Sequence, residues 1–563
     1  MVIDRVKITN FKCVHGERTI QLKEGLNILV GDNEVGKSTV LEAVHLAFTG
    51  EFHGRSVRSN LFSYLFNTQV VAEYLAECEK HEMDFVPPPE IRIEVWFKES
   101  VDAEMFEGDD NSEKKKEVEG FAFIIDFDAE DCQQEYQELL ARGKIDPVFD
   151  IKALPLEYYR VRWASFQRDQ TLSPRKIPVR SVLIDSANYQ YRNGSDVMVQ
   201  HALKDVLLES DVRTIVNAHR EALLKFGASE VIAEINRRIK EHSSTMRRVS
   251  VSAESADLRS WENDVVAQVD QVPFAFAGRG AQCVVKTDLA LCDADAKGAN
   301  LILLEEPESH LSPHRLNQFM ADFESRCEKV QAIVSTHSSF VANKLGIGNI
   351  LLMSKDGSVR FTDLPESNFF KRLPGYDTLR LVLAERVILV EGASDELVVQ
   401  RAYMDMHDGR LPLEDGIDVV SVGIAFSRYV DMLKKLDKKA AIITDNDGET
   451  QRLIEKYKGM LPSLSPIPNQ AAFFSLMSLD EKTFDVPKET VTNYSTLEPY
   501  LLKANSLQTL NVVLGTSCAN NAEMLKHMHA NKTDCALKIF ESEAKIQYPG
   551  YIKQAIKHVE VKS

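Results

Sequence analysis

A glycine-rich segment near the start of the chain has the residue types and spacing of a phosphate-binding loop. The segment GDNEVGKST, residues 31–39, matches the pattern GxxxxGK[ST] and lies between an apolar strand pattern and an amphipathic helix pattern. The glycines let the backbone turn tightly so that its amides point inward, Lys37 supplies positive charge to phosphates, and Ser38 offers a hydroxyl to Mg²⁺. The helix N-terminus adds its partial positive charge. The residues expected to bind the phosphates are Asn33, Gly36, Lys37, Ser38 and Thr39.

Two adjacent glutamates end an apolar strand pattern much later in the chain. The segment LILLEEPESHLSP, residues 301–313, places Glu305 and Glu306 at the end of the strand. Two acids at such a position are costly unless a cation or a water molecule needs them. We therefore expect Glu305 to help hold Mg²⁺ and Glu306 to orient the attacking water as a general base.

Two further segments have features of an anion site. AIVSTHSS places His337 at another strand end, where a neutral imidazole could contact a γ-phosphate, although a lone histidine there is more often structural. FAFAGRGAQ carries Gly278, Gly280 and Gln282 in a turn that opens a helix, which makes it a second candidate anion site.

A second acidic constellation lies in the last third of the chain. ERVILVEGASDE puts Glu391 after a buried strand and Asp395 in the next turn, and AAIITDNDG puts Asp445 and Asp447 after another strand. In a parallel sheet both clusters emerge at the carboxyl edge, and alternate residues of the extended DND triplet face the same way. Carboxylates gathered so closely repel one another unless Mg²⁺ or Mn²⁺ neutralises them. Two solvated loop ends remain the alternative, because DNDG is also a good turn sequence.

Length and composition limit the class of protein. The chain has 563 residues, 44% hydrophobic and 27% charged, which predicts three or four globular domains. No apolar run approaches a spanning helix and the start lacks the apolar core of a secretory signal, so we expect a cytoplasmic protein without membrane contact. The eight cysteines form no CxxC pair and are interpreted as packing residues of a reducing compartment. The net charge of −18 opposes wrapping of DNA over the whole surface.

The strand and helix patterns that position these residues indicate an α/β fold. Strand, loop and helix patterns open the chain, a helical insert interrupts them, and a second α/β unit with a helical tail begins near residue 384. The acidic stretch 99–120 between two apolar strands is expected to be an exposed hairpin tip. The expected divisions are a first ATPase part at 1–190, a helical insert at 191–255, a second ATPase part at 256–370, and a metal-binding α/β domain with its tail at 380–563.

The order of phosphate loop, glycine-rich signature, double-glutamate strand and strand-end histidine resembles the ATPase heads of the ABC class. The helical insert explains the long separation between Lys37 and Glu305. The resemblance implies ATP as the nucleotide, and a dimer in which Gly278 to Gln282 of one protomer complete the site of the other. The characteristic glutamine loop of that class has only Gln167 and Gln170 as candidates.

The second acidic constellation resembles the Toprim domain of topoisomerases, primases and certain nucleases. An ABC-class ATPase followed by a Toprim domain in one chain resembles the OLD (overcoming lysogenization defect) family, which includes the Gabija nuclease subunit. In that family Toprim carboxylates bind two metals and cut DNA, and a late glutamate and a late lysine complete the site. The resemblance places these two at Glu498, in STLEPYLL, and at Lys532, in NKTDCALKIF.

The sequence thus predicts an ATP-binding, Mg²⁺- or Mn²⁺-dependent DNA endonuclease in a homodimer or homotetramer, and the resemblance adds a role in bacterial defence against phage. The basic runs at 236–240, 246–248 and 434–439 are candidate backbone contacts for DNA, although each run alone is more typical of a solvated face. Three alternatives stay open. They are a non-catalytic DNA-bridging ATPase of the RecF or SMC kind, a topoisomerase-like enzyme with a tyrosine nucleophile, and a subunit whose cutting waits on a partner protein or nucleic acid.

Overall fold

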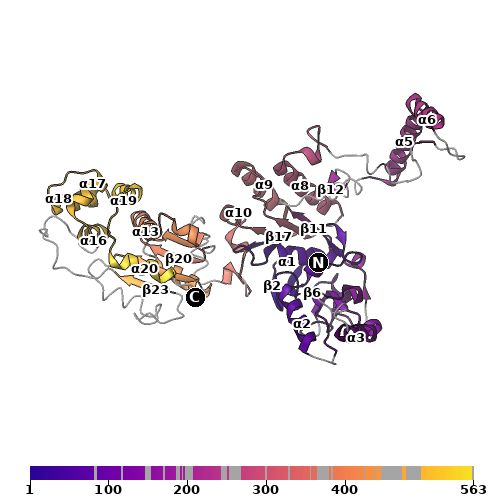
Figure 1. Cartoon of the computed structure of the whole chain (residues 1–563), viewed down its shortest axis with the longest axis horizontal. Coiled ribbons are helices and arrows are strands. Elements are labelled where there is room, and N and C mark those ends of the chain that lie inside the picture. The colour runs from indigo at the N-terminus through magenta and orange to yellow at the C-terminus, as the bar shows by residue number, and fades with distance from the viewer. Residues whose placement is uncertain are drawn as a thin grey trace. The chain divides into compact units, whose positions relative to one another are not determined.

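The chain folds into two compact units (Figure 1), of which residues 1–345 with 351–358 form the first and residues 346–350 with 359–563 the second. A computed structural model describes all residues except 81–84, 116–117, 146–153, 169–170, 186–190, 193–194, 197–206, 243–249, 253–260, 262–267, 298–300, 328–329, 355–356, 364–379, 382–383, 424, 437, 446–471, 477–495 and 561–563.

A six-stranded sheet forms the centre of the first unit, in the order β11-β16-β17-β3-β18-β19. The pairs β11–β16, β16–β17 and β17–β3 are parallel. Their sequences are almost uniformly apolar because both faces of a parallel sheet are covered. The strands are β3 (Leu26–Val30), β11 (Ser181–Asp185), β16 (Leu301–Glu305), β17 (Gln331–Thr336), β18 (Ile350–Met353) and β19 (Ser358–Arg360).

A seven-stranded antiparallel sheet forms the second layer of this unit. Its order is β10-β9-β8-β6-β1-β2, and β7 pairs with β8. The strands are β1 (Ile3–Thr9), β2 (Glu17–Gln21), β6 (Ile91–Phe97), β7 (Glu107–Gly108), β8 (Val118–Phe127), β9 (Tyr159–Ser165) and β10 (Thr171–Leu172).

Helix α1 (Lys37–Thr49) is buried between the two sheets, since it contacts β11, β16 and β17 as well as β1 and β6. Trp163 of β9 fixes the end of this helix by donating from Nε1 to the carbonyl of Ala47 at 2.7 Å. The turn at Gly50 has φ of 70°, and a Cβ there would lie 2.8 Å from the Trp163 ring. Helices α8 (Arg279–Lys297), α9 (Pro313–Arg326) and α10 (Ser339–Lys344) lie on the other face of the parallel sheet (Figure 1).

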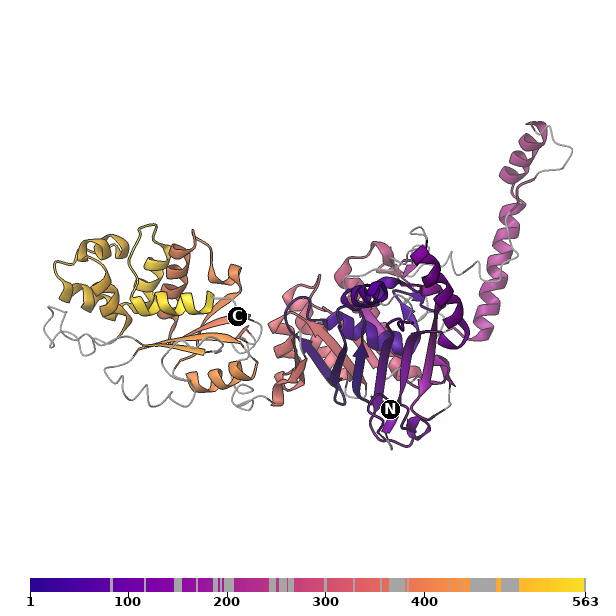
Figure 2. The ribbon, with the colours of Figure 1, turned by 60° about the horizontal axis from the view of Figure 1, so that its bottom comes forward.

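The other α-helices that the structure describes in the first unit lie outside this sandwich. They are α2 (Thr68–Lys80), α3 (Ala129–Ile145), α5 (Glu209–Gly227) and α6 (Glu230–His242). Helices α5 and α6 fall in the predicted helical insert and follow one another with a short break, as Figure 2 shows. Three short antiparallel pairs are also described in this unit. They are β4 (Glu51–Phe52) with β5 (Arg55–Ser56), β12 (Tyr191–Arg192) with β13 (Ser195–Asp196), and β14 (Gln268–Val269) with β15 (Val272–Pro273).

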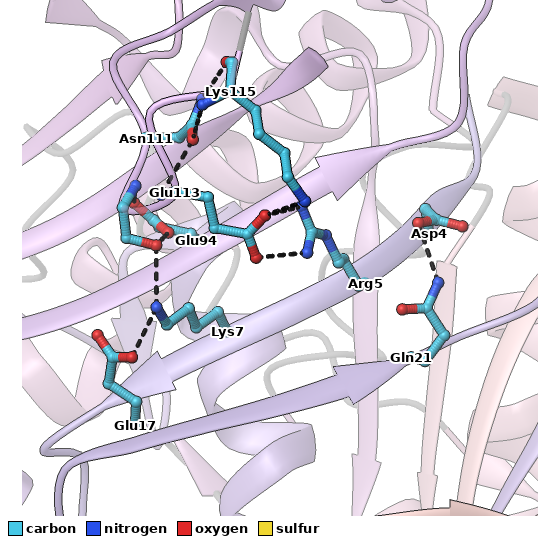
Figure 3. A network of polar contacts seen from close by, with 10 residues as sticks. Asp4, Arg5, Lys7, Glu17, Gln21, Glu94, Asn111, Glu113 and Lys115 are labelled. Atoms are coloured by element: carbon cyan, nitrogen blue, oxygen red, sulfur yellow. Dashed lines mark hydrogen bonds and ion pairs between the residues drawn. The ribbon is translucent and has the colours of Figure 1, made fainter.

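The acidic stretch at 99–120 is not a simple exposed tip, so this expectation is wrong in part. Ala103 and Phe106 are fully buried, and the loop folds back over β6 and β1 (Figure 3). Ser112 donates from its backbone N–H and its hydroxyl to the buried carboxylate of Glu94, at 2.9 and 2.5 Å. Arg5 donates twice to Glu113, at 2.6 and 3.0 Å. The charges that suggested a solvated loop instead satisfy one another across the sheet.

The second unit is built on a four-stranded parallel sheet in the order β21-β20-β22-β23. The strands are β20 (Arg386–Val390), β21 (Ile417–Ser421), β22 (Lys439–Thr444) and β23 (Ala472–Leu476). Helix α13 (Ala393–Met406) contacts β21, and α14 (Phe426–Lys435) contacts β22.

The predicted helical tail is confirmed over the described residues. It comprises α16 (Leu497–Ala504), α17 (Leu507–Leu514), α18 (Asn521–Ala530), α19 (Lys532–Glu541) and α20 (Gly550–Glu560). Helix α19 packs along α13, and α20 packs on β22, β23 and β20. Within the described parts of the chain, no helix is long and apolar enough to cross a bilayer.

Candidate functional site

The phosphate loop follows β3, whose five residues are all buried, and ends where α1 begins. Gly36 has φ of 93°, and a Cβ there would meet Cys13 Sγ at 2.9 Å and Arg18 Nη1 at 3.0 Å. Only glycine therefore suits this position, for reasons of both backbone angle and space. Lys37 is 5% exposed, and its Nζ donates to the carbonyls of Gly31 and Asp32 at 2.8 Å each. Its ammonium is thus held inside the loop where phosphates would lie.

The loop residues differ in how far they face outward. Asn33 is exposed, Ser38 is half-buried and Thr39 is buried. Cys13 is also exposed, and its sulfur lies 3.2 Å from Thr39 Oγ1, so the interpretation of every cysteine as a packing residue is wrong at Cys13. The seven cysteines whose side chains the structure describes are all free.

Carboxylates gather at the carboxyl edge of the parallel sheet beside this loop. The register aligns Asp185 of β11 with Glu305 of β16, and Glu305 with Ser335 of β17. Burial raises the pKa of Glu305 to about 7, with further increases from the negative charges of Asp185 and others, while a hydrogen bond with Ser38 lowers it. A carboxylate in this environment is stabilised in its charged form by a cation, so Glu305 and Ser38 fit the Mg²⁺ role predicted for them.

Glu306, His337 and Lys37 form a chain of polar contacts. His337 Nε2 lies 3.2 Å from Glu306 Oε1, and Lys37 Nζ lies 3.4 Å from His337 Nδ1. Burial and the charge of Lys37 lower the pKa of His337, which favours a neutral ring that accepts from Lys37 and donates to Glu306. Glu306 has φ of 41°, a backbone angle that is uncommon and strained for a residue other than glycine.

Glu308 holds the segment that carries His337, a role that the sequence reasoning did not assign. Its Oε1 accepts from the Thr336 hydroxyl at 2.7 Å and from the backbone N–H groups of His337 and Ser338 at 3.0 and 3.1 Å. Asp185 was also missed. The strand SVLID ends in an acid as LILLE does, and Glu308 follows Glu306 within EPES, so both signals were present in the sequence.

The glycine-rich signature lies at the start of α8. A Cβ on Gly280 would meet the His310 carbonyl at 2.5 Å, so this glycine lets the signature approach the segment that follows Glu306. Gly278 is exposed and has open space around its Cα. The buried amide of Gln282 donates to the carbonyls of Phe274 and Ala277 at 2.6 and 3.1 Å, which fixes the turn itself. Any contact of these three residues with a nucleotide stays a prediction.

Neither candidate for the glutamine loop, Gln167 or Gln170, can be assigned to that role from the structure. Gln167 is exposed just after β9, and Gln170 lies outside the described residues.

In the second unit, the predicted carboxylates lie at the carboxyl ends of β20 and β22. Glu391 follows β20, Asp395 lies in the first turn of α13, and Asp445 follows β22. The N–H of Gly392 donates to Asp395 Oδ2 at 3.0 Å, and the hydroxyl of Thr444 donates to Glu391 Oε2 at 3.3 Å. Asp447 lies outside the described residues.

The helical tail brings Glu498 and Lys532 to this edge. Glu498 is 5% exposed, and its Oε2 accepts from the Thr496 hydroxyl at 2.8 Å. Lys532 Nζ lies 3.4 Å from Glu498 Oε1, and His529 Nδ1 lies 3.9 Å from Glu498 Oε2. Of the HMH segment at 527–529, His529 is thus a neighbour of the carboxylates, which its sequence context did not indicate.

The electrostatics of this cluster fit a hard cation. Burial, followed by the nearby carboxylates Asp395, Glu391 and Glu498, raises the pKa of Asp445 to about 8. Burial also raises the pKa of Asp395 to about 6, with Glu391 and Glu498 adding to the shift. Asp445 Oδ1 is buried and finds no hydrogen-bond partner among the described residues. Oxygen ligands of this kind suit Mg²⁺ or Mn²⁺.

The described side chains do not close a metal shell by themselves. Among them, no three His, Cys, Asp or Glu residues are arranged to hold one metal ion. The sequence leaves Asp447 as the remaining candidate ligand.

Tyr551 of α20 lies near the same carboxylates but is not available to DNA. It is 6% exposed, and burial together with Asp445 and Asp395 raises the pKa of its phenol well above the ordinary range. A phenol that is buried and hard to ionise is a poor nucleophile. Tyr551 therefore does not support the topoisomerase alternative.

One of the predicted basic runs, at 236–240, is partly neutralised within the chain. Arg237 pairs with Glu234 and Glu241, at 2.6 and 2.7 Å, and Arg238 pairs with Glu234 at 3.0 Å. In the run at 434–439, Lys438 donates to the carbonyl of Ala384. The run at 246–248 lies outside the described residues.

The raised pKa values of the second cluster predict how pH and metal affect stability. The folded, metal-free protein holds protons on Asp395 and Asp445 more tightly than an unfolded chain, in which their pKa is 3.8. Its stability should therefore fall as pH rises from about 4 to about 8. Because Mn²⁺ stabilises the ionised carboxylates, it should raise the melting temperature more at pH 8 than at pH 6.

Circular dichroism melts of the nucleotide-free protein with and without Mn²⁺ would measure this difference. Asp445→Asn should reduce it, because the variant lacks the most shifted carboxylate. An equal increase at both pH values in the wild type would contradict the electrostatic account.

Comparison with known families agrees with the geometry of both units. A sequence profile described as an AAA domain matches residues 5–169, and a second AAA profile matches residues 289–343. A profile described as the TOPRIM domain of overcoming lysogenization defect protein-like proteins matches residues 382–447. The chain therefore joins an AAA-type ATPase head to an OLD-like Toprim domain. This pairing confirms the resemblance to OLD family nucleases and the predicted fold class.

Two curated proteins are similar to parts of the chain. It is 52% identical over 46 residues to the DNA double-strand break repair Rad50 ATPase of Methanopyrus kandleri, covering 8% of this chain and 5% of that protein. It is 22% identical over 255 residues to the DNA replication and repair protein RecF of Clostridium tetani, covering 45% of this chain and 58% of that protein. The matched segments thus span less than two thirds of the length of each relative.

Solved SMC heads are also similar to the chain. One is the SMC head domain from Thermotoga maritima, with 14% identity and a TM-score of 0.29 over 64% of this chain and 98% of that one. Another is the SmcHead bound to the C-winged helix domain of ScpA, with 13% identity and a TM-score of 0.31 over 64% of this chain and 96% of that one. Because both scores are low, the fold assignment depends on the sheet order and the family profiles.

Proposed function

We propose that the protein is an ATP-binding and ATP-hydrolysing DNA endonuclease that requires Mg²⁺ or Mn²⁺ and whose Toprim site is gated by nucleotide at the ATPase head. The observation that carries this proposal is the buried Toprim cluster. At the carboxyl edge of a parallel sheet, burial and the neighbouring carboxylates raise the pKa of Asp395 and Asp445, and Lys532 lies beside Glu498.

In the head, the chain's own residues are arranged to hold phosphates and to deprotonate a water. Lys37 and the loop amides hold the phosphates, and Ser38 with Glu305 would hold Mg²⁺. Glu306 accepts the proton of the attacking water, and neutral His337 keeps the carboxylate oriented by a 3.2 Å contact. Glu308 holds the His337 segment in place for this task.

In the Toprim domain, Glu391, Asp395, Asp445, Asp447 and Glu498 are the residues that would hold divalent metal. When bound, the metal would stabilise the attacking and leaving oxygens of a phosphodiester displacement. Gly392 and Thr444 orient two of the carboxylates through hydrogen bonds. Lys532 supplies a positive charge beside the phosphate that is cut.

The proposal includes a homodimer or homotetramer. The exposed Gly278 at the signature is compatible with closure on the nucleotide of a second protomer. The helical insert exposes apolar side chains on α5 and α6, among them Leu224, Phe226 and Val231, which suits a role in dimerisation. DNA would be bound through its backbone, and the OLD-like Toprim domain suggests defence against phage in the cytoplasm as the setting.

The alternative with the strongest support among the relatives is a non-catalytic DNA-binding ATPase, since a RecF protein and a Rad50 ATPase are similar to parts of the chain. The Toprim cluster argues against it, because a domain without chemistry has no need for buried carboxylates of raised pKa beside a lysine.

The test is incubation of supercoiled and linear DNA with the full chain, in Mg²⁺, Mn²⁺ or EDTA, with and without ATP. We expect cutting only with metal, and a response to ATP in the wild type that Lys37→Ala loses, because Lys37 holds the phosphates. Metal-dependent cutting with no covalent protein on the ends supports the proposal. DNA binding without any cutting would support the RecF-like alternative, and protein attached to DNA ends would support the topoisomerase.

A further inference from the structure

Arg380 connects three parts of the Toprim domain, and no role was assigned to it from the sequence. It lies just before β20, and its guanidinium donates to both carboxylate oxygens of Asp418, from Nε at 2.7 Å and from Nη2 at 2.6 Å. Its Nη1 donates to Glu396 Oε1 at 3.4 Å, and Nη2 also reaches the carbonyl of Val419 at 3.3 Å. One planar group therefore joins β21 to the first turn of α13.

Both acids depend on this contact because they are removed from water. Asp418, on strand β21, is a carboxylate that is only 3% exposed. Burial raises the pKa of Glu396, and Arg380 together with a backbone hydrogen bond from Ser421 opposes that rise. Removing one partner of a buried ion pair leaves a buried charge without compensation, so the arrangement holds α13 and β21 together in one register.

The turn that Arg380 holds also carries a predicted metal ligand. Glu396 directly follows Asp395, and both belong to the first turn of α13, where the N–H of Glu396 donates to the carbonyl of Gly392 at 3.1 Å. Asp395 accepts from the N–H of Gly392 in the same turn. A shift of Glu396 therefore moves Asp395 on α13 relative to Asp445, which follows β22.

We propose that Arg380 is a positioning residue of the nuclease site, which sets the place of Asp395 through Glu396 and Asp418 and so determines how tightly the Toprim cluster binds divalent metal. This inference rests on the proposed function of that cluster. Groups that orient metal ligands without touching the metal typically change metal affinity by about 10- to 100-fold when they are removed.

The test compares Arg380→Lys with Arg401→Lys in the full-length protein. Arg401 lies on α13, the helix that carries Glu396. It pairs with Asp405 at 3.0 Å and donates to the carbonyl of Phe540 at 2.9 Å, and its side chain is 13% exposed against 33% for Arg380. Lysine keeps the charge at both positions but cannot reproduce the paired contacts of a guanidinium. The control thus loses a comparable contact away from the carboxylates.

The readout is Mn²⁺ binding to nucleotide-free protein by isothermal titration calorimetry, with DNA cutting measured alongside. We expect Arg380→Lys to weaken Mn²⁺ binding by about 10-fold or more, and Arg401→Lys to bind within about twofold of the wild type. Glu396→Gln should also weaken Mn²⁺ binding. If Arg380→Lys does not fold, the Mn²⁺ affinity of Glu396→Gln tests the inference in its place. Wild-type Mn²⁺ affinity in both Arg380→Lys and Glu396→Gln would overturn the inference.

The outcome can be separated from failure of the proposed function. If the wild type cuts DNA and Glu391→Ala does not, while Arg380→Lys and Glu396→Gln bind Mn²⁺ normally, only the role of Arg380 is refuted. If the wild type binds Mn²⁺ but cuts no DNA under any condition, the endonuclease proposal fails. The Mn²⁺ titrations then still test whether Arg380 affects metal affinity.

Discussion

Glu391→Ala is expected to lower the rate of metal-dependent DNA cutting by about 1000-fold or more, the upper range for losing one group that stabilises charge in a transition state. Glu391 ends β20, accepts a hydrogen bond from Thr444 and adds to the pKa shifts of Asp395 and Asp445. Its loss removes a negative charge that would hold the metal between two neighbouring strands. The measurement is the initial rate of nicking of supercoiled DNA at saturating Mn²⁺.

ATP hydrolysis serves as the internal control for this variant. Because Glu391 belongs to the second unit, ATP turnover by Glu391→Ala should stay close to that of the wild type. A control variant is Glu385→Ala, which replaces an exposed glutamate just before β20, at the opposite end of the same strand from Glu391. If Glu391→Ala cuts as fast as Glu385→Ala, the assignment of the Toprim site is wrong.

Glu306→Gln is expected to slow ATP hydrolysis by about 100- to 10,000-fold, the range for loss of a general base, while ATP still binds. The amide keeps the size of the side chain and can still contact His337 Nε2, which lies 3.2 Å from Oε1 in the wild type. It cannot accept a proton from water. Lys37 and the phosphate loop are unchanged, so nucleotide affinity should stay within about threefold of the wild type.

Single-turnover hydrolysis and equilibrium binding of a fluorescent ATP analogue would separate the two effects. Glu308→Gln is the matched comparison, because it changes the neighbouring carboxylate that holds the His337 segment but is not placed to accept the proton. If both variants lose ATP turnover equally, the loss comes from displacement of the segment that carries His337. If Glu306→Gln hydrolyses ATP at the wild-type rate, Glu306 is not the general base. The ATP response of DNA cutting in Glu306→Gln then shows whether binding alone operates the gate, since a ligand shifts an equilibrium by its differential affinity for two states.

Much of the site could be predicted because its motifs are local. The phosphate loop, the double glutamate and the strand-end carboxylates each lie in a run of a few residues whose pattern indicates a strand followed by a turn. Where the interpretation failed, the contacts were not local. Cys13 lies against Thr39 because the hairpin of β1 and β2 covers the loop, and the acidic stretch at 99–120 is held by Arg5 and Glu94, which come from other strands.

The sequence by itself therefore determined the chemistry: a phosphate loop on one α/β unit and a carboxylate cluster for a hard cation on another, because short-range patterns and residue types encode strands, turns and charge. Only the tertiary structure decided which groups meet. Parallel pairing puts β17 between β3 and β16, so that His337 stands between Lys37 and Glu306, and the helical tail brings Glu498 and Lys532 to Asp395 and Asp445. The physical reason is that strand order and burial depend on pairing between segments far apart in the chain, and burial is what shifts these pKa values.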